Sequence, residues 1–87
     1  MKYKKIDDEN LRDLVKKRLD AHPMLKDEHI FVEVLDQQVI LSGVIDDLSI
    51  KWLAEDIIAD LMGVLSIDNR IEVRQEKYND RLSFYVE

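Results

Sequence analysis

Residues 63–73, GVLSIDNRIEV, contain the pattern that decides the fold of this chain. After the opening glycine, apolar side chains fall on one parity and polar or charged side chains on the other, which is typical of a strand with one buried face. The apolar members are Ile67, Ile71 and Val73. Asn69 is the single polar residue among them. The stretch therefore predicts a half-buried strand with one amide directed inward.

Two segments have the 3.6-residue periodicity of helices. Residues 8–22 follow Asp7 or Asp8, either of which can cap the free N–H groups, and they end before Pro23, which has no N–H. The predicted buried stripe is Leu11, Leu14, Val15 and Leu19. Residues 48–62 follow Asp46 or Asp47 in the same way. The second predicted stripe is Ile50, Leu53, Ala54, Ile57 and Leu61.

Residues 29–36 and 39–45 each alternate apolar and polar side chains, and the gap between them is short, so we expect an antiparallel hairpin. The gap lacks Asn-Gly or Asp-Gly, which leaves the turn type open. Gly63 is expected to end the second helix in the left-handed conformation at the C′ position. The predicted fold is α+β with the order αββαβ: two helices packed on one face of a three-stranded mixed sheet.

Composition limits the function classes. The chain has 87 residues, enough for one small domain, and no cysteine, which excludes disulfides and thiolate zinc sites. There is no export signal and no apolar run long enough to span a bilayer. As written, the chain is expected to stay in the cytoplasm, and in the periplasm if it is a mature or excised fragment. We expect a basic arm over residues 1–6, a domain over 7–74 and a C-terminal tail over 75–87, which docks on the domain in one reading.

The charge balance argues against binding of nucleic acid. The net charge is −6, and no basic stripe with interleaved aromatic residues is present. His22 and His29 flank two acidic residues, but the spacing lacks the three or four converging groups that zinc needs. No serine lies in a nucleophile elbow, and two glycines cannot form a phosphate loop. We expect no enzyme activity, no metal and no cofactor.

In its order of elements the chain resembles the BON domain. The resemblance runs from about residue 7 to 74 and is carried by five ordered pieces rather than by one motif. These pieces are the Leu11, Val15, Leu19 stripe with HPML, then IFVEV, VILSGVI, Leu53 with Ala54, and GVLSIDNRIEV. The resemblance implies a non-enzymatic module that contacts phospholipid membranes or envelope partners in a bacterial stress or envelope context.

The resemblance also implies structural roles for Gly43, Gly63 and Asn69, the last with an amide that satisfies backbone groups near the Gly63 bend. One departure is visible in the hairpin. Where the family commonly has Asp-Gly, this chain has Asp36-Gln37, so we expect a looser or differently shaped loop.

Trp52 falls about 200° from Ile50 on the second helix, counting 100° per residue, and so opposite the buried stripe. Leu48 and Ala59 fall near it. Three different groups could bury this strip. The first is the set of tail residues Leu82, Phe84 and Val86, the second is a partner protein or a second copy in a weak homodimer, and the third is a bilayer interface. The strip and the tail together are the basis of the runner-up function, a cytoplasmic protein-interaction or homodimerisation module.

The leading hypothesis is docking on phospholipid or on an envelope-associated protein. The candidate lipid contacts are Arg12, Lys16 and Lys17, helped by the arm residues Lys2, Lys4 and Lys5. The plain alternative is that these charges form a solvated helix face. Binding of a small cation by acidic loops is a third hypothesis, which no ligand spacing supports.

Overall fold

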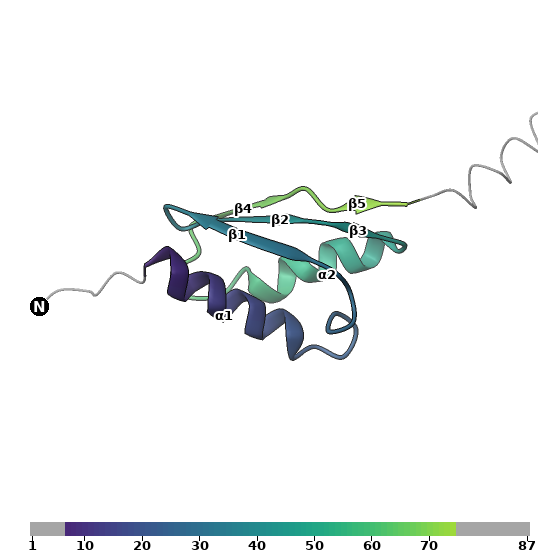
Figure 1. The fold of residues 1–87 in the computed structure, drawn as a ribbon, viewed down its shortest axis with the longest axis horizontal. Coiled ribbons are helices and arrows are strands. Elements are labelled where there is room, and N and C mark those ends of the chain that lie inside the picture. The colour runs from purple at the N-terminus through teal and green to yellow at the C-terminus, as the bar shows by residue number, and fades with distance from the viewer. Residues whose placement is uncertain (1–6, 75–87) are drawn as a thin grey trace, which may run out of the picture.

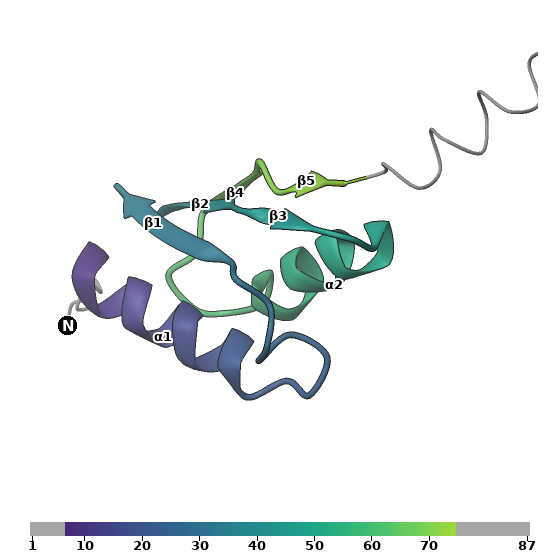
Figure 2. The same ribbon diagram turned by 45° about the vertical axis from the view of Figure 1, so that its right-hand side comes forward.

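A computed structural model describes residues 7–74 of the chain and has the predicted α+β fold. Both helices lie against one face of the sheet, and no helix of residues 7–74 covers the opposite face (Figures 1 and 2). The elements in chain order are α1 (Asp8–Asp20), β1 (Phe31–Leu35), β2 (Gln38–Ser42), β3 (Val44–Ile45), α2 (Leu48–Ile58), β4 (Ser66–Asn69) and β5 (Glu72–Val73).

The sheet is mixed, as expected. β1 and β2 pair antiparallel, β2 and β4 pair parallel, and β3 and β5 continue the parallel pairing beyond an interruption. The predicted strands 39–45 and 63–73 are therefore each broken into two. The register does not slip at the break, since Gln38 pairs with Ser66 and Ile45 with Val73, a constant offset. The two parallel pairs thus form one interrupted ladder.

Gly43 lies at the break between β2 and β3. Its φ is +133°, outside the range that residues with a Cβ readily adopt. A Cβ at this position would lie 2.5 Å from the carbonyl oxygen of His29, a backbone atom that cannot rotate away. The glycine therefore allows the chain before β1 to cross close to the sheet, while its own carbonyl still accepts from Glu72 N–H at 2.8 Å.

Both helices end earlier than predicted. α1 stops at Asp20, because Pro23 disfavours helical geometry at the residue before it and the chain turns ahead of that point. α2 stops at Ile58, and the following N–H of Ala59 donates to Asp56 O, three residues back instead of four. The expectation that Gly63 is the C′ residue is therefore wrong: Gly63 has a positive φ of 100° but lies in the loop between α2 and β4.

Each helix is capped by one of the two predicted aspartates. Asp7 accepts from Asn10 N–H at 2.9 Å at the start of α1. Asp47 accepts from the N–H and the hydroxyl of Ser49 at 2.9 and 2.8 Å at the start of α2. The hydroxyl hydrogen bond, followed by the backbone one, lowers the pKa of the Asp47 carboxyl below its ordinary value.

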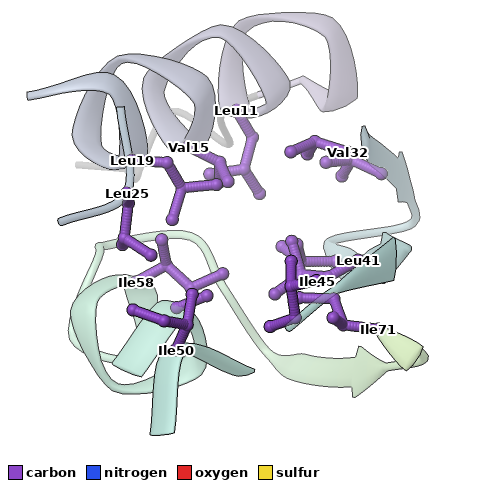
Figure 3. Packing of buried hydrophobic residues seen from close by; sticks show 13 residues of the cluster. Leu11, Val15, Leu19, Leu25, Val32, Leu41, Ile45, Ile50, Ile58 and Ile71 are labelled. Atoms are coloured by element: carbon purple, nitrogen blue, oxygen red, sulfur yellow. The ribbon is translucent and has the colours of Figure 1, made fainter. Parts of the chain in front are cut away.

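The core lies between the helices and the sheet, where apolar side chains from every layer point toward one another (Figure 3). Its thirteen buried members are Leu11, Val15, Leu19, Leu25, Val32, Val34, Val39, Leu41, Ile45, Ile50, Ala54, Ile58 and Ile71. The predicted stripes differ from this core at their edges. Leu53, Ile57 and Leu61 are only partly buried. Leu14 is 41% exposed, because it lies on the flank of α1, and Ile58, which no expectation included, is fully buried.

The expectation of a looser hairpin loop is wrong. Asp36 and Gln37 alone connect β1 to β2, with φ values of 49° and 66°. Both residues are in the left-handed region that tight two-residue hairpins require and that asparagine or glycine usually supplies. The carboxylate of Asp8 accepts from both turn amides, at 2.8 Å from Asp36 N–H and 3.0 Å from Gln37 N–H. The start of α1 thus holds the turn from outside.

The crossing at Gly43 leads to a stability prediction. Gly43→Ala is expected to lower the free energy of unfolding by about 1–3 kcal/mol, the range for overpacked sites, because the new methyl meets the His29 carbonyl. Urea denaturation measures the change. Ser66→Ala, an exposed position at the start of β4, is the control and should stay within about 0.5 kcal/mol. An alanine variant at position 43 as stable as the parent would contradict the close approach.

The Asp8 contact leads to a second prediction. Asp8→Ala removes two charge-assisted hydrogen bonds to the turn, so unfolding should become easier by about 1–2 kcal/mol more than in the control Glu9→Ala. Both variants remove one negative charge from the first turn of α1, so the helix-dipole effect cancels in the comparison. Equal losses in the two variants would show that Asp8 acts through the dipole alone.

Candidate functional site

The cations proposed for lipid contact lie on α1. Lys16 and Lys17 are exposed on the side of the helix turned away from the core. Arg12 is exposed too, but its Nε donates to the carbonyl oxygen of Val32 at 3.1 Å. Since β1 is an edge strand, this hydrogen bond covers part of an otherwise open sheet edge. The structure therefore leaves two lysines fully available and gives the arginine a partial structural role.

The three candidate lipid contacts, Arg12, Lys16 and Lys17, differ from the remaining arginines in their ion pairing. Three salt bridges occur among residues 7–74: Arg18 with Asp60, Arg70 with Asp68, and Arg74 with Asp46. None of them involves Arg12, Lys16 or Lys17. Acidic residues share the same side of α1, at Glu9, Asp13 and Asp20, so the face is mixed in sign.

Arg18 differs from its neighbours on α1. Its Nη1 donates to the carbonyl of Ile57 at 3.1 Å and lies 3.3 Å from Asp60 Oδ1. The side chain thus satisfies a free carbonyl near the C-terminus of α2 and joins the two helices.

The strip on α2 is placed as predicted, opposite the buried face. Trp52 is 52% exposed and Leu48, one turn earlier, is 50% exposed; Ala59 is exposed beyond the helix end. The ammonium of Lys51 lies 5.3 Å from the centroid of the Trp52 ring, within cation–π range. The tail residues proposed to meet this strip, Leu82, Phe84 and Val86, lie outside the described residues, as do the arm residues Lys2, Lys4 and Lys5.

Asn69 points inward but not to the Gly63 bend. Its Nδ2 donates to the carbonyl of Lys51 at 2.9 Å and to Glu55 Oε1 at 3.2 Å, while its Oδ1 accepts from Ile71 N–H at 3.2 Å. The amide therefore joins the break between β4 and β5 to the middle of α2. The expectation of a contact near the bend is wrong because another amide occupies it: Gln37 Nε2 donates to the carbonyl of Gly63 at 2.9 Å.

The outer face of the sheet carries apolar side chains that the functional predictions did not use. Phe31 and Leu35 on β1 are 66% and 61% exposed, and Val44 on β3 is half exposed. Across the same face Arg70 pairs with Asp68 at 2.8 Å, a contact that raises the pKa of the guanidinium. The alternation in the HIFVEVLD segment already placed Phe31 and Leu35 opposite the buried valines, so the signal for this surface was present in the sequence.

The possible metal ligands of the described residues are dispersed. Within residues 7–74 no three His, Cys, Asp or Glu side chains are grouped closely enough to hold a metal ion. His22 lies in the loop after α1, where its Nδ1 accepts from Met24 N–H at 3.1 Å. No helix of the described part of the chain is long and apolar enough to cross a membrane. What the described surface can offer a ligand is exposed charge and exposed apolar side chains.

Comparison with known proteins identifies the family. The family model for the BON domain matches residues 7–75, which include every helix and strand described above. No curated protein matches the chain. BON domains are generally non-enzymatic, and their general function is phospholipid binding. Because the family model covers most of the chain and the fold agrees with it, the chain belongs to the BON domain family.

Proposed function

We propose that this chain is a non-enzymatic module that docks on anionic phospholipid through the outward side of α1. The observation that carries the proposal is the contrast in pairing. Lys16 and Lys17 are exposed and enter no ion pair among residues 7–74, whereas Arg18, Arg70 and Arg74 each have an acidic partner. The general function of the family points to the same class of ligand.

The expected binding is weak and sensitive to salt. A Lys or Arg near an anionic membrane contributes about 1 kcal/mol, so the three α1 cations supply about 3 kcal/mol before the neighbouring acids are counted. Glu9, Asp13 and Asp20 oppose this attraction. The three lysines of residues 1–6 precede α1 directly in the chain and would add to it. Attraction of this kind falls with ionic strength, since the Debye length is about 10 Å at 0.1 M salt.

The setting we propose is a bacterial stress or envelope response. In this setting the domain would meet the membrane from the cytoplasm or, as part of an exported protein, from the periplasm. An envelope-associated protein that presents phosphate or carboxylate groups would be recognised by the same cations.

Vesicle flotation tests the proposal. The protein should rise with vesicles rich in anionic phospholipid at low salt, rise less at moderate salt, and stay in solution with neutral vesicles. Lys16→Glu with Lys17→Glu should weaken binding at least roughly 30-fold, the equivalent of two lost cations. The control is Lys51→Glu with Arg74→Glu, which changes the net charge equally but on α2 and after β5. Equal loss in both double variants would show that net charge, and not the face of α1, decides binding.

A second candidate function is a cytoplasmic protein-interaction or homodimerisation module. The exposure of Trp52 and Leu48 favours it, because tryptophan is enriched at the centres of protein interfaces. Under this candidate the protein stays in solution with anionic vesicles, and Trp52→Ala lowers the apparent mass measured by light scattering. A parent chain that is monomeric at all concentrations would exclude the homodimer.

A further inference from the structure

The strip formed by Leu48, Trp52 and Ala59 lies on the side of α2 that faces away from the sheet, and the described residues cover it only in part, Lys51 among them. About half of the tryptophan is open to water in the described part of the chain. The residues beside the strip are acidic: Glu55 lies next to it, and Asp56 lies one turn after Trp52 on the same side.

The described residues end close to the start of α2, where the strip begins with Leu48. The N–H of Arg74, the residue after β5, donates to the carbonyl of Ile45 at 2.7 Å, and its Nε lies 3.4 Å from Asp46 Oδ1. Asp46 precedes Leu48 by two residues, so the chain leaves the sheet at the N-terminal end of α2. The hydrogen bonds from Asn69 to Lys51 O and Glu55 show that the neighbouring flank of α2 faces the strand pair β4–β5. The segment that follows Arg74 therefore begins near Leu48, the first residue of the strip.

We propose that residues 75–87, QEKYNDRLSFYVE, are the ligand of this strip within the same chain. They lie outside the described residues, and their sequence places Leu82, Phe84 and Val86 on one parity, so that an extended segment would offer one apolar edge. The charges of the segment are mixed, with Lys77 and Arg81 against Glu76, Asp80 and Glu87, so the apolar edge and not charge is the basis of the contact.

The reach of the segment is sufficient. Leu82 lies eight positions after Arg74, and an extended chain covers about 3.3 Å per position, or roughly 26 Å. The eleven residues of α2 span about 16 Å at 1.5 Å per residue. Both ends of the strip are therefore accessible to the apolar edge without any change in the described domain.

A segment of the same chain suits this strip better than a second copy does. Stable protein–protein interfaces bury more than about 1,000 Å² in total, which three side chains along one helix cannot provide. A short tether instead presents its segment at an effective concentration in the millimolar range, so a small contact is enough. A protein partner for the strip would then have to displace residues 75–87.

Trp52 is the single tryptophan of the chain, so the tryptophan fluorescence of the protein measures how far this side chain is shielded from water. In the full-length protein, Leu82→Asp with Phe84→Asp should shift its emission to longer wavelength and increase its quenching by acrylamide. Ser83→Asp with Tyr85→Asp is the matched control: the charge change is identical, but the substitutions fall on the opposite parity. The control should leave emission and quenching as in the parent.

Three results would overturn the proposal: no change in either double variant, equal change in both, or a parent signal that shifts on dilution, which would assign the cover to a second copy. Far-UV circular dichroism checks that the domain is folded. Should the first double variant lose that signal, Phe84→Ser alone is read in the same way. No lipid is present in these measurements, so their outcome is independent of membrane docking through α1.

Discussion

The parallel pairing of residues 38–45 with residues 66–73 is the constraint on which the rest of the structure depends. A parallel pair cannot be closed by a hairpin, so the chain must return from one end of the sheet to the other, and α2 forms that return. Gly43 lies at the break in this ladder, where the carbonyl oxygen of His29 comes too close to leave room for a Cβ. Asn69, at the same break, hydrogen-bonds the middle of α2 and so fixes the helix against the strand pair it connects.

The same arrangement determines which surfaces are left for recognition. Both helices use their apolar faces on one side of a narrow sheet, and thirteen side chains fill the space between them. Binding therefore falls to outward surfaces: the mixed but cation-bearing side of α1, the apolar strip of α2, and the open face of the sheet with Phe31 and Leu35. These surfaces differ in chemistry, so a charged ligand and an apolar one need not compete for the same residues.

Local pattern predicted the elements well and their edges poorly. Alternation and helical spacing placed Leu11, Val39 and Ile71 in the core because side-chain direction follows from the backbone period alone. Leu14 and Ile58 were misjudged because a residue on the flank of a stripe is buried only if a neighbouring element reaches it. For Leu14 none does so fully, whereas Ile58 lies between α2 and the rest of the core. The hairpin turn was misjudged for a related reason: the carboxylate that stabilises Asp36 and Gln37 comes from Asp8, far away in sequence.

By itself the sequence determined the order αββαβ, the inward parity of each strand and the family, and it narrowed each helix cap to two adjacent aspartates, since all of these depend on residues close together in the chain. Only the tertiary structure decided which groups meet across elements. In the structure Asn69 hydrogen-bonds Lys51 and Glu55. Arg12 donates to the edge strand β1, and Arg18 donates to the end of α2. Arg74, the residue after β5, lies beside the start of α2. Such contacts depend on the positions of whole elements, and many sequences with the same local patterns would place different side chains there.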